Sequence, residues 1–186
     1  WSVPEPVALS GASQYAARLA VADNTLYAVW VERDADGDRV VYSRWQADSL
    51  AWAASAAVAA GASGVSLHTP DVAADGAGNL LVVWQAEGAG GAKDLYSAWH
   101  LAGEGWRGPV VVGRGESPRL SANGREAALV WQEAGDGGDI AITWSGWPGG
   151  LWLPPQRVNQ DEGGAAQRAP DVALDRWGNT TILWED

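Results

Sequence analysis

The sequence alternates along its whole length between short apolar runs and polar, glycine-rich segments. The apolar runs LYAVW, LLVVW, AALVW and TILW end at Trp30, Trp84, Trp131 and Trp184, spaced about 50 residues apart. A short run that is apolar throughout and bounded by turn residues predicts a strand covered on both faces. No segment shows sustained helical periodicity, so we expect an all-β chain built from repeats.

Each of these strands is preceded by a second apolar run and a polar turn. The segments PDVAADGAGNLLVVW and PDVALDRWGNTTILW align residue for residue, while SPRLSANGREAALVW and AARLAVADNTLYAVW are more divergent copies. Asp, Asn and Gly fill the turn in these copies, and such residues tolerate the positive φ angles of tight hairpins. Each unit is therefore predicted to open with a β-hairpin.

Two further strands are predicted after each tryptophan. A polar stretch ends in Asp38, Asp94 or Asp139, and a short strand, a turn and one more extended run follow it. The segment ADSLAWAASAAVAAGA has high helix propensity, but Trp52 within it occupies the third tryptophan position of its unit, so we predict a strand there too. Four-stranded units repeated every 40 to 50 residues or so are typical of β-propeller blades.

The tryptophan spacing also divides the chain. It predicts an N-terminal outer strand at 1–10, complete blades near 15–60, 68–113 and 117–160, and a partial blade at 168–186. Three arrangements fit: part of a longer propeller, a four-bladed ring closed by the N-terminal strand, or an open array completed by neighbouring copies. Because an unpaired strand edge is a template for pairing, we expect self-association or a partner strand where Trp1–Ser10 and Ala169–Asp186 form the incomplete blade.

The pattern P-D-V-A-x-D-x-x-G-N-x-x-x-x-W, followed by D-I/L-Y/A and then W-x-x-P, resembles the sialidase-like (BNR-type) propeller repeats of secreted and surface proteins of bacteria. The resemblance extends over essentially the whole chain and implies a β-propeller fold and an extracellular or cell-surface location. Propellers of this kind include hydrolases, lectins and scaffolds, so the fold does not specify an activity. The sialidase Asp-box S-x-D-x-G-x-T-W is absent, because Asp75 and Gly78 are three positions apart rather than two.

Composition narrows the range of partners. The 186 residues carry a net charge of -11, with 12 basic and 23 acidic side chains, which argues against a nucleic-acid partner. The absence of cysteine excludes disulfides and cysteine-based zinc sites. No apolar run reaches the roughly 18 residues of a membrane span.

Arginine and carboxylate positions offer candidates for chemistry. Arg18 and Arg119 share a first-strand position that faces the expected central channel, while the remaining arginines occupy no repeated position. Paired carboxylates for glycoside hydrolysis would have to come from Glu87, Glu133 and Glu185, which follow the second-strand tryptophans. The polar start of a loop explains these glutamates equally well, so we predict no catalytic residues.

The segment DADGD spaces Asp34, Asp36 and Asp38 like the start of a calcium-binding loop. Such loops end in a bidentate Glu at the twelfth position, where this chain has Trp45. We therefore favour a plain hairpin turn, and calcium is the one cofactor for which the sequence offers a candidate site.

Trp147 and Trp177 lie outside the repeated tryptophan positions, in predicted turns. An exposed indole in a turn is a platform for a sugar or a protein, and packing within the turn is the alternative. Together these features predict a non-catalytic extracellular or cell-surface propeller, a scaffold or binding module for a protein or a glycan, or a structural subunit of a larger assembly. The alternative is a fragment of a sialidase-like glycoside hydrolase.

Overall fold

A computed structural model describes residues 6–135, 138–160 and 166–186, and all regular elements in these ranges are strands. They are β1 (Ser13–Ala22), β2 (Thr25–Asp34), β3 (Gly37–Gln46), β4 (Ala51–Trp52), β5 (Ala56–Ala60), β6 (Ser66–Ala74), β7 (Leu80–Glu87), β8 (Lys93–Leu101), β9 (Gly105–Ala122), β10 (Glu126–Glu133), β11 (Ile140–Gly146), β12 (Gln156–Arg157), β13 (Arg168–Leu174) and β14 (Thr180–Glu185). The all-β prediction is confirmed. Within these ranges there is no helix long and apolar enough to cross a membrane.

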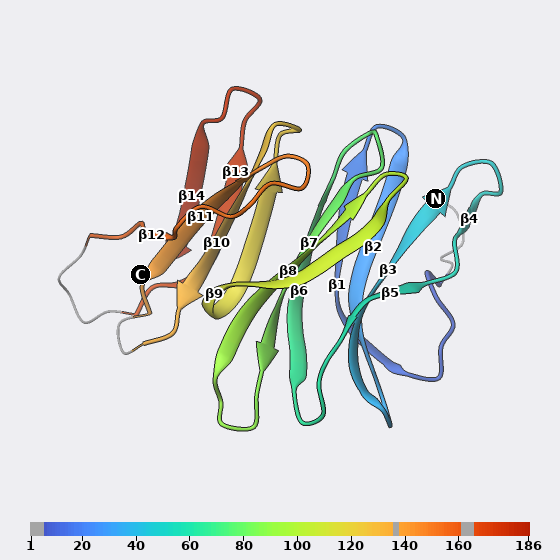
Figure 1. Ribbon diagram of the computed structural model, residues 1–186, viewed down its shortest axis with the longest axis horizontal. Helices are drawn as coiled ribbons and strands as arrows, with labels where there is room; N and C mark the ends of the chain where they lie inside the picture. The colour runs from blue at the N-terminus through green and yellow to red at the C-terminus, as the bar shows by residue number, and fades with distance from the viewer. Residues whose placement is uncertain (1–5, 136–137, 161–165) are drawn as a thin grey trace.

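The strands form antiparallel sheets that stand side by side as blades (Figure 1). Blade 1 contains β1, β2 and β3, with β4 and β5 both paired to β3. Blade 2 contains β6, β7, β8 and the first half of β9. Blade 3 contains the second half of β9 with β10, β11 and β12, and blade 4 contains β13 and β14. The strand predicted for the alanine-rich segment is confirmed, since β4 and β5 lie within it.

The second strand of each complete blade is buried, with a blade on both sides of β7 and β10, and with blade 2 on one side and residues 7 and 8 on the other side of β2. Trp84 packs with Val29 and Val31 between blades 1 and 2. Trp131 packs with Leu81 and Val83 between blades 2 and 3. Successive blades are therefore joined by apolar interfaces that run along their second strands.

β9 joins blades 2 and 3 without a loop, because its first half pairs with β8 and its second half with β10. The crossing passes over the Trp131 indole. A Cβ on Gly113 would lie 2.9 Å from Cζ2 of Trp131, and a Cβ on Gly115, which has φ of 150°, would lie 2.1 Å from the Gln132 carbonyl oxygen. Only glycine fits at Gly115 without displacing backbone.

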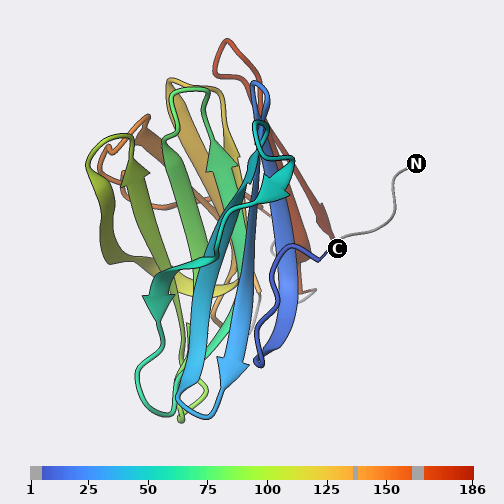
Figure 2. The ribbon, with the colours of Figure 1, turned by 90° about the vertical axis from the view of Figure 1, so that its right-hand side faces the viewer.

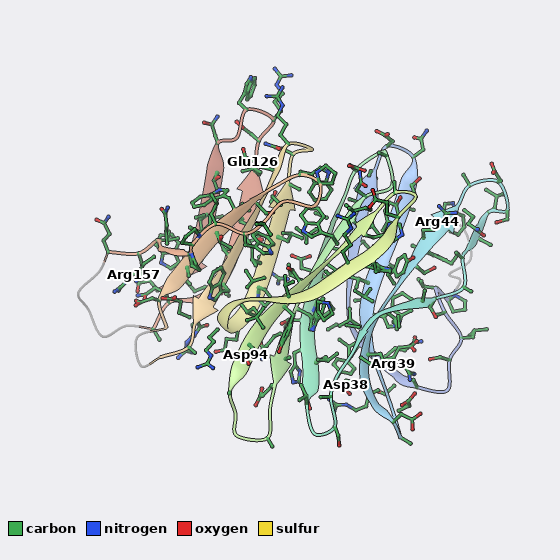
Figure 3. The ribbon with its side chains drawn as sticks, viewed as in Figure 1. Asp38, Arg39, Arg44, Asp94, Glu126 and Arg157 are labelled. Atoms are coloured by element: carbon green, nitrogen blue, oxygen red, sulfur yellow. The ribbon has the colours of Figure 1, made fainter. Side chains whose placement is uncertain are left out.

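The aspartates at the starts of the third strands have a shared structural role. Each carboxylate forms an ion pair with an arginine: Asp38 with Arg33, Asp94 with Arg114, and Asp139 with Arg157. Asp38 and Asp94 lie toward the lower ends of their blades in Figure 3. These pairs account for several of the arginines that occupy no repeated position in the sequence.

The N-terminal segment takes a different place from the one expected. Residues 6–10 form no strand, and Val7 and Ala8 pack against Ala28, Trp30 and Val41 of blade 1. β13 and β14 pair only with each other within the described ranges. Residues 7 and 8 therefore cover the apolar outer face of blade 1. Residues 1–5 of the predicted strand lie outside the described residues.

Candidate functional site

The first strands of successive blades lie next to one another, since β1 contacts β6, β6 contacts β9, and β9 contacts β13. Each first strand carries a bulge at the same place, marked by a shift in its pairing register. The bulge residue has a positive φ angle although it is not glycine: Ala16 (56°), Thr69 (42°), Ser117 (56°) and Ala169 (48°). Such backbone strain costs on the order of 1–3 kcal/mol and clusters at functional sites, where bulges redirect side chains.

Two positions beyond each bulge residue lies a charged side chain. These side chains are Arg18, Asp71, Arg119 and Asp171, and all of them line one cavity of about 450 Å³. The charge alternates from blade to blade, so each carboxylate has an arginine on a neighbouring first strand. This cavity is our candidate functional site.

Asp71 is held most firmly of the four. Its Oδ1 accepts a hydrogen bond from the Val72 backbone N–H at 3.0 Å, and its Oδ2 accepts one from the Leu120 N–H of blade 3 at 2.9 Å. Burial raises the pKa of Asp71 above its ordinary value, while these hydrogen bonds and the charges of Arg119 and Arg18 oppose the rise. The two arginines therefore help to keep a partly buried carboxylate ionised.

The arginines keep most of their hydrogen-bond donors free. Arg18 donates from Nη1 to the Ala17 carbonyl at 3.2 Å, and neither Arg18 nor Arg119 forms an ion pair within 4.0 Å in the described part of the chain. Asp171 is exposed and accepts one hydrogen bond, from the Val172 N–H to Oδ1. The cavity thus presents both donors and acceptors to a ligand.

The structure brings together Arg18 and Arg119, the two arginines singled out from the sequence. Asp71 and Asp171 were missed, although the signal was present, since both occupy the arginine position in the aligned PDVA segments. Glu87, Glu133 and Glu185 do not line this cavity.

Trp147 and Trp177, the two tryptophans outside the repeated positions, differ in solvent exposure. Trp147 is 9% exposed, donates its indole N–H to Asp75 Oδ2 at 2.7 Å, and packs edge-on against Trp99 with ring centroids 5.0 Å apart. Trp147 therefore packs in the core between blades and offers no face to a ligand. Trp177 is 71% exposed, and the Arg176 guanidinium lies 4.0 Å from its ring centroid. Trp177 keeps the accessible indole that a platform requires.

The aspartates of DADGD do not come together as a metal site. Asp34 binds Arg39 and the Asp36 N–H, whereas Asp38 is buried and binds Arg33. Among the described residues there is no group of three or more His, Asp or Glu side chains able to hold a metal ion. Asp34 and Asp38 each form an ion pair with an arginine, Arg39 and Arg33.

Asp38 instead ties blade 1 to blade 2. Arg33 binds its carboxylate through Nε at 2.5 Å and Nη2 at 2.7 Å, and the Leu67 N–H and Tyr15 hydroxyl donate to Oδ2 at 2.8 and 3.1 Å. The Arg33 hydrogen bonds, with those from Leu67 and Tyr15, lower the pKa of Asp38 to about 2 despite its burial. Burial and the hydrogen bond to Asp38 raise the pKa of Tyr15 to about 12.

The fold is similar to that of several solved β-propeller structures. It is similar to a Hadza microbial sialidase, with a TM-score of 0.58 and 9% identity over 93% of this chain and 40% of that one. It is also similar to a Penicillium chrysogenum α-L-arabinanase complexed with arabinobiose, with a TM-score of 0.61 and 16% identity over 92% of this chain and 57% of that one. A thermostable family-43 glycoside hydrolase matches with a TM-score of 0.56 and 12% identity over 92% of this chain and 65% of that one.

These similarities confirm the β-propeller fold class, of the kind found in sialidases and arabinanases. The chain spans 40 to 65% of the length of these structures, less than two thirds of each. No protein-family model matches the sequence, and comparison with curated proteins finds no relative.

Proposed function

We propose that this chain is a glycan-binding β-propeller module whose ligand occupies the cavity between Arg18, Asp71, Arg119 and Asp171. The observation that carries the proposal is the repeated bulge, which turns one charged side chain from each first strand into the same cavity. Sugar hydroxyls both donate and accept hydrogen bonds. The carboxylates of this cavity can accept from them, and its guanidinium groups can donate to them.

The similar structures support a glycan rather than a protein as the ligand. They include a sialidase, an arabinanase complexed with arabinobiose and a polysaccharide lyase, and this chain covers 40 to 57% of the length of each. Identities of 9 to 16% relate the folds alone, so the ligand class for this chain rests on the cavity. An extracellular or cell-surface location and a non-catalytic role belong to the same proposal.

One observation favours a second candidate function, glycoside hydrolysis. Two carboxyl groups, those of Asp71 and Asp171, line the same cavity, and burial raises the pKa of Asp71. A hydrolase of this type pairs an acid of raised pKa with an ionised carboxylate. Against this, both Asp71 oxygens already accept backbone hydrogen bonds, which hold the carboxylate in its ionised form.

Binding is tested by titration calorimetry with arabinobiose, arabinan oligosaccharides and sialyllactose. Arg119→Gln removes the charge and the guanidinium donors but keeps a polar side chain, and we expect at least about 10-fold weaker binding of any ligand that binds. The matched control is Arg125→Gln, which changes an exposed arginine in the turn before β10, outside the cavity. Equal affinity of both variants, or no binding of any of these sugars, would contradict the proposal.

Hydrolysis is tested with the corresponding p-nitrophenyl glycosides. A binding module leaves them intact while still binding the free sugar. Turnover that disappears in Asp71→Asn and Asp171→Asn would instead establish the hydrolase.

A further inference from the structure

The outer rim between blades 2 and 3 carries a cluster of exposed apolar side chains. Among the described residues of these two blades, the large apolar side chains that are exposed are Val110, Val111, Leu151 and Leu153. The valines belong to the outermost strand of blade 2, and the leucines follow β11 in blade 3. Each of these blades has a neighbouring blade packed on both sides, so these side chains are exposed although the faces of their blades are covered.

The fold does not require valine at the two strand positions. When WRGPVVV of blade 2 is aligned with WLPPQRV of blade 3, Gln156 and Arg157 take the places of Val110 and Val111, and the strand pairing agrees. The outer strand of blade 1, β5, exposes only alanines. Since outer strands with polar residues or alanine form equally well, the exposed valines are better explained by binding than by folding.

A cavity of about 390 Å³ lies beside these side chains. Val110 and Val111 line it from blade 2, and Leu151 and Trp152 line it from blade 3. Its volume falls at the lower end of the range of small-molecule sites. In Figure 2 the yellow-green first half of β9 lies at the left edge of the molecule with the orange segment after β11 beside it, and the blue β1 lies toward the other side. We call this hollow the rim cavity.

The blade 3 wall of the rim cavity is fixed in place. The Trp152 indole N–H donates to Ser97 Oγ of blade 2 at 2.8 Å, and Ser97 is fully buried. The turn before Trp152 is closed by a hydrogen bond from the Gly150 N–H to the Gly146 carbonyl at 3.0 Å, and a Cβ on Gly150 would lie 2.6 Å from that oxygen. A cavity formed in advance lowers the ordering cost of binding.

The side chains of the rim cavity select the class of ligand. Arg107 is the one charged side chain among the described residues that line it, and Glu104 already pairs with this guanidinium. The net charge of -11 further disfavours an anion. Sugar hydroxyls would lie against valine and leucine side chains that offer no hydrogen bonds.

An uncharged apolar molecule meets none of these costs. Trp99 and Trp152 both line the cavity, and aromatic side chains interact favourably with another aromatic ring. The geometry points to a small uncharged aromatic molecule as the ligand of the rim cavity. This inference goes beyond the glycan proposal, because both the residues and the ligand class are different.

The experiment is a titration of the 186-residue chain with benzyl alcohol, followed by the NMR signals of the Leu and Val methyl groups. We expect the signals of Val110, Val111 and Leu151 to shift together and to saturate with one dissociation constant. Val111→Asp and Leu151→Asp put a charge beside the apolar ring and should weaken this binding at least about 10-fold. The matched control is Leu50→Asp, which alters a leucine that is 71% exposed in the turn between β3 and β4 and should leave the binding unchanged.

Two further titrations test the ligand class. Benzoate should bind more weakly than benzyl alcohol, by about 3-fold or more, and glucose should leave the three methyl signals unchanged. Equal or tighter binding of benzoate, saturable shifts with glucose, or no shift with benzyl alcohol would overturn the proposal. So would a dimer in sedimentation velocity that Leu151→Asp abolishes, because a second copy would then cover the cavity.

Circular dichroism confirms that each variant is folded. Arg119→Gln, which lies in the charged cavity, should leave the binding of benzyl alcohol unchanged. Failure of this proposal and failure of the glycan proposal are therefore separate results.

Discussion

Trp147 donates its indole N–H to the carboxylate of Asp75 at 2.7 Å, although 72 residues separate them in the chain. The bond joins the turn after β11 in blade 3 to the hairpin turn between β6 and β7 in blade 2. Asp75 Oδ1 also accepts the N–H groups of Ala77 and Asn79, so one carboxylate shapes its own turn and holds the next blade. Burial opposes ionisation of Asp75, but the hydrogen bonds from Asn79 and Trp147 prevail and lower its pKa.

Trp147→Phe is therefore expected to destabilise the protein by about 2 kcal/mol, because it leaves less apolar surface buried and removes a hydrogen bond to a charged group. The control is Trp177→Phe at an exposed turn position, where we expect a change below about 0.5 kcal/mol. Urea unfolding followed by circular dichroism measures both. Equal effects of the two substitutions would show that the Asp75 contact is not stabilising.

Asp38 makes stability depend on acidity. Its pKa is about 2 in the folded chain, against an ordinary value of 3.8, so its stabilising contribution is present above pH 3.8 and is lost as pH falls through 2. The difference amounts to about 2 kcal/mol between pH 5 and pH 2. In Asp38→Asn this part of the pH dependence should disappear. Urea unfolding at several pH values measures it, and parallel curves for the two proteins would contradict the assignment.

Gly115→Ala is expected to destabilise the protein by roughly 3 kcal/mol, since the new Cβ would meet the Gln132 carbonyl and the Trp131 indole. Gly146→Ala is the matched control, because a Cβ there meets nothing within 4 Å. Thermal unfolding compares the two. If Gly115→Ala were as stable as the control, the close crossing of β9 over Trp131 would be incorrect.

An Ala→Gly substitution usually destabilises a strand, but at a bulge residue with a positive φ angle it is expected to stabilise the protein. Ala16 has φ of 56°, a conformation that costs an L-residue about 1–2 kcal/mol and glycine almost nothing. Glycine relieves this strain but also increases the conformational entropy of the unfolded chain, which offsets part of the gain. Ala16→Gly should therefore stabilise the folded protein by about 0.5 kcal/mol. Ala20→Gly, in the same strand without a positive φ, should destabilise it by about 1 kcal/mol. Loss of stability in both would indicate that the bulge at Ala16 is not strained.

The fold was predictable because the information lay in a repeated pattern. Trp30, Trp84 and Trp131 marked the second strands, and Trp52 outweighed the helix propensity of the alanines around it. The packing of residues 6–8 was not predictable, because a strand-like sequence does not specify which sheet edge or face it will meet. Local patterns describe the strand, whereas tertiary contacts choose its partner.

The site was predicted in part. Arg18 and Arg119 were found by their shared position in the repeat, and the same alignment held Asp71 and Asp171. Those aspartates were overlooked because the bulge that turns the side chain inward has no sequence signature when its strained residue is Ala, Thr or Ser. Trp147 and Trp177 were indistinguishable in sequence, since a turn does not indicate whether a neighbouring carboxylate will bind the indole.

The unbroken path of β9 has a mechanical consequence. Blades 2 and 3 share one strand, so no flexible connector between them is able to stretch under load; separating them requires breaking the pairing of β9 with β8 or with β10. Strands β6 to β12 belong to one hydrogen-bonded sheet and are expected to open together in amide exchange. Blade 1 would respond separately, because only side-chain contacts and a loop connect it to this sheet, and bending of the molecule would concentrate at that junction.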